Sequence, residues 1–170
     1  MIIISKKFKN FGLLEALVLF STVYVVLMLL WTVSTRSAVE EKANTVKLNH
    51  KKIVDFINGE INQCDQGDEN SKTKWGDSCK LEWSSEKVIE YINNNMKIIN
   101  PYSSNKEIIK QAQDPRLQAE GKAGQSTEMG VIFLSSKNFS AEAGSEWVIG
   151  TCIKSPCVAA GNNELTSVYR

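Results

Sequence analysis

Apolar residues occupy nearly every position between residues 11 and 34, and this run is the strongest pattern in the chain. It contains 24 residues and a single charged side chain, that of Glu15. As an α-helix with a rise of ~1.5 Å per residue, the run is ~36 Å long, which is enough to cross a hydrocarbon core of ~30 Å with some tilt. The pattern therefore predicts a membrane-spanning helix.

A cleavable secretory signal is the competing interpretation of this run. Such a signal has an apolar core of about 7–15 residues, followed by a cleavage site with small residues. The present run is longer, and the sequence after it, TRSAVEEKANTV, has no A-x-A-like site. An uncleaved anchor therefore fits better. Lys6, Lys7 and Lys9 precede the run, and basic residues favour the cytoplasmic side, so residues after 35 are expected outside the cytoplasm.

The helical pattern continues beyond the apolar run, because no proline or glycine occurs again before Gly59. Within residues 35–62 the apolar positions recur at steps of three and four, which is typical of a helix with one buried stripe. The predicted stripe consists of Val39, Ala43, Val46, His50, Ile53 or Val54, Ile57 and Ile61, and the predicted solvent face carries Glu40, Glu41, Lys47, Lys51, Asp55 and Glu60. We therefore expect one helix over residues 11–62, with its stripe covered by residues 63–170.

Residues 63–170 begin with a polar loop and then show a short helical pattern. Ser84 or Ser85 is a plausible N-cap for that helix, and Asn100-Pro101 ends it. Residues 108–116 are expected to add a helical turn or two. Tryptophans in this part of the chain, Trp75, Trp83 and Trp147, are expected in the core.

Three later segments are rich in β-branched and aromatic residues, namely 129–135, 147–153 and 165–169. The connections between them carry glycine, asparagine, serine and proline, so an antiparallel meander is expected. Laid on the apolar stripe of the long helix, such a sheet gives both surfaces a partner. The expected fold class is α+β, a long N-terminal helix packed on a small antiparallel sheet.

The charge balance argues against a nucleic-acid binder. The net charge is +1, from 20 basic and 19 acidic residues, and three of the basic residues lie in the first ten positions. Without those ten residues, 17 basic residues face 19 acidic ones, a net charge of −2. The sequence also has no phosphate-binding glycine loop, G-x-S-x-G or H-E-x-x-H motif, so neither catalysis nor a cofactor is expected.

The four cysteines, Cys64, Cys79, Cys152 and Cys157, suit a body that lies outside the cytoplasm, where disulfides persist. They allow three pairings, of which the nearest-neighbour pairing is the simplest. The alternative is a metal site. The single histidine, His50, and the cysteine spacings give poor support to zinc, so we expect disulfides and no metal.

The N-terminus, KKFKN followed by FGLLE and the apolar run, resembles the prepilin N-terminus of type IV pilins and of the related pseudopilins. The resemblance implies that prepilin peptidase removes a basic leader, residues 1–10, by cutting between Asn10 and Phe11, and that Phe11 is then N-methylated. That family usually has glycine before the cut, where this chain has Asn10. The family fold is similar to the one expected above, and Cys152 with Cys157 resembles its C-terminal disulfide.

The resemblance implies a structural subunit that is held in the bacterial inner membrane with its N-terminus in the cytoplasm. From there it polymerises with copies of itself, through the pilus assembly machinery, into an extracellular filament. Attachment, surface movement and DNA uptake all use such subunits. One alternative is a pseudopilin of type II secretion. An alternative of another class is a single-pass, membrane-anchored periplasmic binding domain that keeps its leader.

Glu15 has two interpretations. In the first turn of a helix a carboxylate interacts favourably with the helix dipole, by a few tenths to ~1 kcal/mol. In a filament, Glu15 would instead meet the Phe11 amine of a neighbouring subunit and fix the axial register, as a buried polar group does in a coiled coil.

Overall fold

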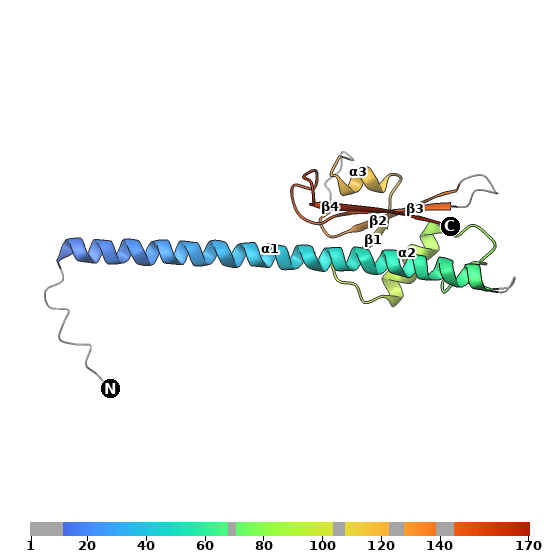
Figure 1. Ribbon diagram of the computed structural model, residues 1–170, viewed down its shortest axis with the longest axis horizontal. Coiled ribbons are helices and arrows are strands. Elements are labelled where there is room, and N and C mark those ends of the chain that lie inside the picture. Colours follow the sequence, from blue (N-terminus) through green and yellow to red (C-terminus); the bar gives the residue numbers. More distant parts are fainter. Residues whose placement is uncertain (1–11, 68–70, 104–107, 123–127, 139–144) are drawn as a thin grey trace, which may run out of the picture. The chain divides into compact units, whose positions relative to one another are not determined.

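The computed structural model describes residues 12–67, 71–103, 108–122, 128–138 and 145–170. The predicted processing residues, Asn10 and Phe11, lie outside these ranges. The helices and strands, in chain order, are α1 (Leu13–Gln66), α2 (Ser85–Asn95), β1 (Ile109–Gln111), α3 (Pro115–Ala119), β2 (Ile132–Asn138), β3 (Ser145–Cys152) and β4 (Asn163–Tyr169) (Figure 1).

The long helix α1 has 54 residues and continues four residues beyond the predicted end at Asn62. The chain divides into two compact units, residues 1–40 and residues 41–170. The buried side chains of α1 begin at Ala43, in the second unit. Val39, which the sequence placed on the apolar stripe, is 44% exposed.

The four strands form one sheet in the order β1-β2-β3-β4. β2, β3 and β4 make the expected antiparallel meander, whereas β1 runs parallel to β2. The prediction of a wholly antiparallel sheet is therefore wrong at one edge, and the sheet is mixed.

Residues 108–116 do not form the helical turns that the sequence suggested. Ile109 instead enters β1, because the side chain of Asn93 in α2 accepts hydrogen bonds from the backbone N–H groups of Ile108 and Ile109 and donates one to the carbonyl of Ile109. Helix α3 begins only after Asp114, whose carboxylate accepts a hydrogen bond from the backbone N–H of Arg116. A contact between distant segments thus overrides the local helical preference.

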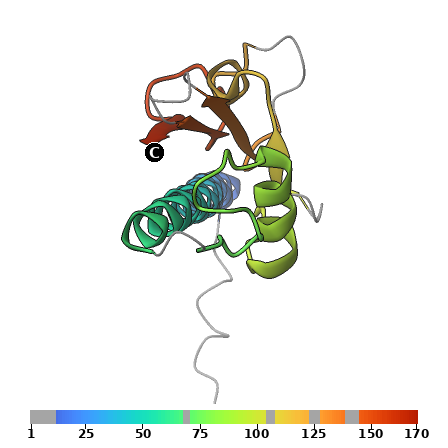
Figure 2. The ribbon, with the colours of Figure 1, turned by 90° about the vertical axis from the view of Figure 1, so that its right-hand side faces the viewer.

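The second half of α1 packs on one face of the sheet, and α3 lies on the other face (Figure 1). α2 lies beside β1 and β2, as Figure 2 shows from the end of the molecule. Its N-cap is Ser84, one of the two serines that the sequence proposed. The core between α1 and the sheet includes Ile53, Ile57, Trp83, Val88, Ile92, Ile132, Leu134, Trp147 and Ile149.

The aromatic residues connect this core to the loop after α1. Trp83 and Trp147 are 4% and 1% exposed, which confirms that they belong to the core, whereas Trp75 is half-buried and packs against Trp83. Phe56 of α1 stacks on Tyr91 of α2, with ring centroids 5.9 Å apart. These contacts join α1, the loop after it and α2 through aromatic surfaces.

Glu60 is buried, and its predicted place on the solvent face of α1 is wrong. It follows Ile57 by three residues and therefore lies on the same buried side of the helix. The loop residue Lys74 approaches it: the ammonium lies 2.5 Å from Oε1, and the backbone N–H of Lys74 donates to Oε2 at 3.0 Å. The positive charge of Lys74 compensates the negative charge of this carboxylate, because an unpaired buried charge would destabilise the fold.

Candidate functional site

Of the two predicted assembly residues, Phe11 lies outside the described residues and Glu15 lies in the first turn of α1. Glu15 is the third residue of the helix, and its Oε2 accepts a hydrogen bond of 3.2 Å from the backbone N–H of Gly12, the residue before the helix. This is one half of a capping box, in which an acidic residue at the third helical position satisfies the N–H of the cap residue. In a single chain, Glu15 therefore has a local role in beginning the helix.

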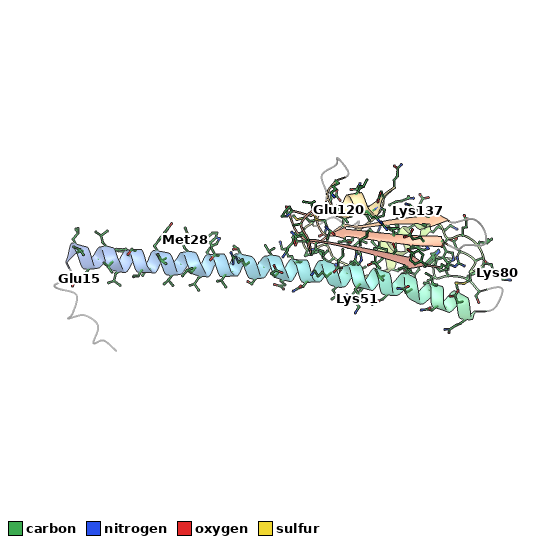
Figure 3. The ribbon with its side chains drawn as sticks, turned by 45° about the horizontal axis from the view of Figure 1, so that its top comes forward. Glu15, Met28, Lys51, Lys80, Glu120 and Lys137 are labelled. Atoms are coloured by element: carbon green, nitrogen blue, oxygen red, sulfur yellow. A yellow bond between two sulfur atoms is a disulfide. The ribbon has the colours of Figure 1, made fainter. Side chains whose placement is uncertain are left out.

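Most side chains of the following turns, up to Val33, are apolar and uncovered. Every large apolar residue from Leu13 to Val33 is between 47% and 83% exposed in the isolated chain. Figure 3 shows the side chains projecting around this part of α1, from Glu15 at its beginning past Met28. Among the described residues, this helix is long and apolar enough to cross a membrane, by its length and composition. A surface of this kind needs lipid or other protein around it.

Four hydroxyl side chains in and just after this stretch bond to their own helix. The hydroxyl groups of Ser21, Thr22, Thr32 and Thr35 each donate to a backbone carbonyl three or four residues earlier, at 2.9 to 3.1 Å. They therefore require no polar partner from outside. Of the described residues of this helix up to Ser34, only Glu15 carries a charge.

The cysteines form two disulfides, Cys64 with Cys79 and Cys152 with Cys157. This is the nearest-neighbour pairing, the simplest of the three that the sequence allowed. The first disulfide ties the end of α1 to the loop that carries Lys74, and the second closes the turn after β3. No cluster of histidine, cysteine or acidic residues suited to a metal occurs in the described ranges.

His50 lies between α1 and the sheet and is 3% exposed. Its Nδ1 is 3.1 Å from the hydroxyl oxygen of Thr151 in β3, and its Nε2 is 2.9 Å from that of Thr166 in β4. The neutral ring uses one nitrogen as donor and the other as acceptor. Burial lowers the pKa of His50 from its ordinary 6.5 to about 4. The residue thus packs in the interior and fastens α1 to two strands.

The lowered pKa of His50 predicts that acid weakens the fold. Because the unfolded chain binds a proton near pH 6.5 and the folded chain only near pH 4, the free energy of unfolding should fall by about 3 kcal/mol as the pH drops through this range. Urea unfolding of the wild type and of His50→Gln at pH 7 and pH 4 measures this effect. The glutamine variant should lose about 3 kcal/mol less than the wild type between the two pH values.

The comparison with His50→Gln cancels the contributions of other titrating groups. Burial raises the pKa of Glu164, which lies beside His50 in the same groove, and the positive charge of Lys47 partly offsets that increase. Protonation of Glu164 therefore favours the folded state, opposite in sign to that of His50, in both proteins. Equal acid sensitivity of the wild type and the variant would contradict the assignment to His50.

Sequence reasoning missed a second group of polar residues, which lines a cavity on the face of the sheet that carries α3. These residues come from α3, β2 and β3, and no spacing along the chain connects them. The alternation of strand residues is the only sequence signal that places some of them on one face. Comparisons of this chain with protein-family models, with curated proteins and with solved structures found no match.

Proposed function

We propose that this protein is a structural subunit of a type IV pilus-like filament, made as a prepilin and polymerised through the first half of α1. The observation that carries the proposal is the combination at the N-terminus. Three lysines precede a helix in which every large apolar side chain up to Val33 is exposed. The single acidic residue in this part of the helix is Glu15, in the first turn. An ordinary membrane anchor does not need a carboxylate at that position.

Lipid covers the apolar half of α1 before assembly, and the helices of neighbouring subunits cover it afterwards. Since the hydroxyl groups of Ser21, Thr22 and Thr32 bond to their own helix, they need no polar partner in either environment. In the filament, Glu15 of one subunit pairs with the amine that cleavage creates at Phe11 of a neighbour. The pair leaves neither charge alone in an apolar core.

The N-terminus of the mature protein tests the proposal. Mass spectrometry of the protein from membranes and from sheared surface fibres should give a chain that begins at Phe11, with the mass of one added methyl group. The same chain from cells without prepilin peptidase should keep its leader and serves as the control. A mature protein that still begins at Met1 would contradict the filament proposal.

Shearing of fibres from the cell surface separates a pilin from a pseudopilin, since a pseudopilin assembles a short periplasmic structure. A membrane-anchored periplasmic binding domain is the second candidate function. The cavity between α3 and the sheet favours it, because a purely structural subunit needs no pocket in its body. For this candidate the leader stays attached and no polymer forms.

A further inference from the structure

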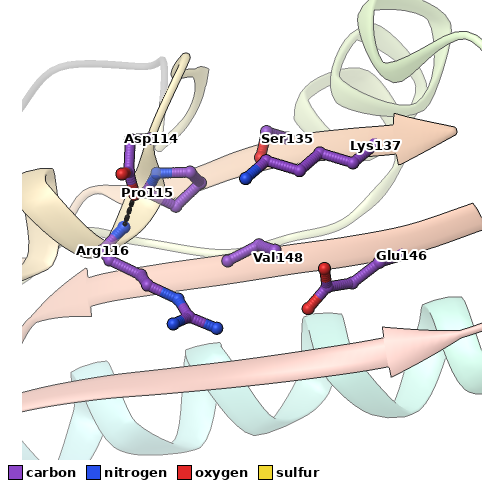
Figure 4. Close-up of a pocket in the computed structure, with 7 residues that line it drawn as sticks. All are labelled: Asp114, Pro115, Arg116, Ser135, Lys137, Glu146 and Val148. Atoms are coloured by element: carbon purple, nitrogen blue, oxygen red, sulfur yellow. Dashed lines mark hydrogen bonds between the residues drawn. The ribbon is translucent and has the colours of Figure 1, made fainter. Parts of the chain in front are cut away.

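The sheet face that carries α3, which we call the outer face, has a small cavity of about 220 Å³ beside that helix (Figure 4). The cavity, here called the α3 pocket, is lined by Asp114, Pro115, Arg116, Ser135, Lys137, Glu146 and Val148. It lies in the unit of residues 41–170 and shares no residue with the N-terminal segment.

Strand register forms the floor of the pocket. Ser135 of β2 is paired with Val148 of β3, and Lys137 is paired with Glu146 two residues further along. The alternation of side chains puts these four residues on the outer face, because Leu134, just before Ser135, and Trp147, between Glu146 and Val148, belong to the core under α1. The backbone of Pro115 packs closely against Gly150 and forms a wall at one end of this floor.

Ser135 lines the pocket and carries an unsatisfied hydroxyl group. The residue is 7% exposed, and its hydroxyl oxygen is buried without a hydrogen-bond partner among the described residues. An unpaired buried hydroxyl destabilises a fold, and natural proteins usually avoid it. A ligand that accepts a hydrogen bond in the α3 pocket would remove this defect.

Two cationic side chains reach the same space from different elements. In Figure 4, Arg116 extends from α3 and Lys137 from β2. Within the described residues neither side chain has an ion-pair partner, in contrast to Lys110, which pairs with Glu128. Arginine and lysine together with a serine hydroxyl are donors suited to a carboxylate.

Two carboxylates also line the pocket, and they differ in what they already bind. Asp114 is occupied by the cap of α3, since its Oδ1 accepts from the backbone N–H of Arg116 at 2.9 Å. Glu146 accepts only the hydroxyl of Tyr169, at 3.3 Å, through Oε1. Oε2 of Glu146 has no hydrogen-bond partner among the described residues, so Glu146 is free to accept from a ligand on the side of the pocket away from α3.

The charges select the ligand. Two cations and two carboxylates leave the lining with no net charge, so a simple anion gains little from it. A molecule with both a carboxylate and an ammonium group matches both sets of partners. The volume is below the roughly 300–1,000 Å³ of drug-sized sites, and the apolar surface of Val148 and Pro115 suits a short aliphatic side chain.

We infer that the α3 pocket binds a small zwitterion of the α-amino-acid class. The ligand carboxylate contacts the Arg116 guanidinium and the Lys137 ammonium and accepts the hydroxyl proton of Ser135. The ligand ammonium donates to Glu146. This inference does not depend on the proposed filament, because the pocket lies in the body and binding is measured on the dispersed subunit.

Isothermal titration calorimetry on the detergent-solubilised full chain tests this inference, with L-alanine as the probe and acetate and methylamine as the single-charge comparisons. L-Alanine should bind saturably, with one site per chain, and more tightly than either comparison. Arg116→Gln and Lys137→Gln should each weaken binding about tenfold, and Ser135→Ala about fivefold, as expected when a charged or a neutral hydrogen bond is lost.

Two variants sharpen the test. Glu146→Gln should weaken the binding of L-alanine but leave that of acetate unchanged or improved. Lys97→Gln removes an exposed lysine just after α2 and should change nothing. Absence of saturable L-alanine binding, equal binding of acetate, or unchanged binding in Arg116→Gln and Lys137→Gln would each overturn the inference. Thermal melts of the variants verify that they remain folded.

Discussion

Replacing Glu15 by glutamine is expected to remove the proposed filaments from the cell surface, while the processed subunit should still accumulate in the membrane. Glutamine has nearly the same shape as glutamate and retains an oxygen that accepts from the backbone N–H of Gly12, so the helix cap survives. Only the charge is lost. In the proposed filament, the Phe11 amine of a neighbouring subunit would then be left unpaired in an apolar core, at an expected cost of ~3–5 kcal/mol per subunit contact.

Sheared fibres and membrane fractions, measured by immunoblotting in the same cells, give the filament yield and the subunit supply. The yield for Glu15→Gln should fall more than tenfold, since each 1.4 kcal/mol corresponds to a factor of ten. Glu41→Gln removes an exposed carboxylate outside the apolar stretch and should leave the yield unchanged. Glu15→Ala, which removes both cap and charge, should lower the filament yield at least as much as Glu15→Gln.

Two outcomes would contradict this account of Glu15. Normal filaments with both Glu15→Gln and Glu15→Ala would show that the register does not depend on the carboxylate. Normal filaments with Glu15→Gln but none with Glu15→Ala would show that the helix cap, and not the charge, is what assembly requires.

Gly150→Ala should destabilise the body of the protein strongly. A methyl group on Gly150 would overlap the carbonyl oxygen of Pro115 and lie 2.8 Å from its carbonyl carbon. The obstacle is backbone, so no side chain can rotate to make room, and α3 must move away from the sheet. Overpacking of this kind costs typically ~1–3 kcal/mol, and we expect the upper part of that range.

Gly59→Ala is the matched control for this prediction. Gly59 lies inside α1, is exposed, and has nothing within 4 Å of an added methyl group. Because alanine favours a helix interior over glycine, this variant should gain up to about 1 kcal/mol. Urea unfolding at pH 7, followed by circular dichroism, measures both variants. A Gly150→Ala protein as stable as the wild type would mean that α3 does not lie tightly on β3.

Displacement of α3 has a further consequence for the α3 pocket, because Pro115 and Arg116 form its wall. Gly150→Ala changes no lining residue, yet it should weaken binding of L-alanine in the same calorimetric experiment. Gly150 of β3 therefore affects the shape of the cavity indirectly, through the position of the α3 backbone.

Several features of the fold could be predicted because they depend on neighbours along the chain. The apolar run predicts α1 through its length, and the stripe from Val39 to Ile61 predicts which side of the helix is buried, except at the exposed Val39. The chemistry of serine pointed to Ser84 or Ser85 as the cap of α2, and the structure has Ser84 there. The nearest-neighbour disulfides also follow from short separations, although the sequence left three pairings open.

The errors have a common cause, since each involves residues that meet only in the folded chain. Ile109 joins a strand because Asn93 bonds to its backbone, and Glu60 tolerates burial because Lys74 reaches it from the next loop. Glu60 stands at a helical step from Ile57, so its burial was open to prediction, but its charge suggested the solvent face. Its partner, Lys74, is 14 residues away and gave no signal.

The sequence by itself determined a long helix with a membrane-compatible half, a covered half, a three-stranded meander and a body that suits disulfides. These follow from periodicity, run length and residue chemistry, which act over a few residues. Only the tertiary structure decided the parallel strand β1, the buried Glu60 and His50 contacts, and the α3 pocket with its unsatisfied Ser135 hydroxyl. Each of these depends on which segments pack together, and packing joins residues that the sequence keeps far apart.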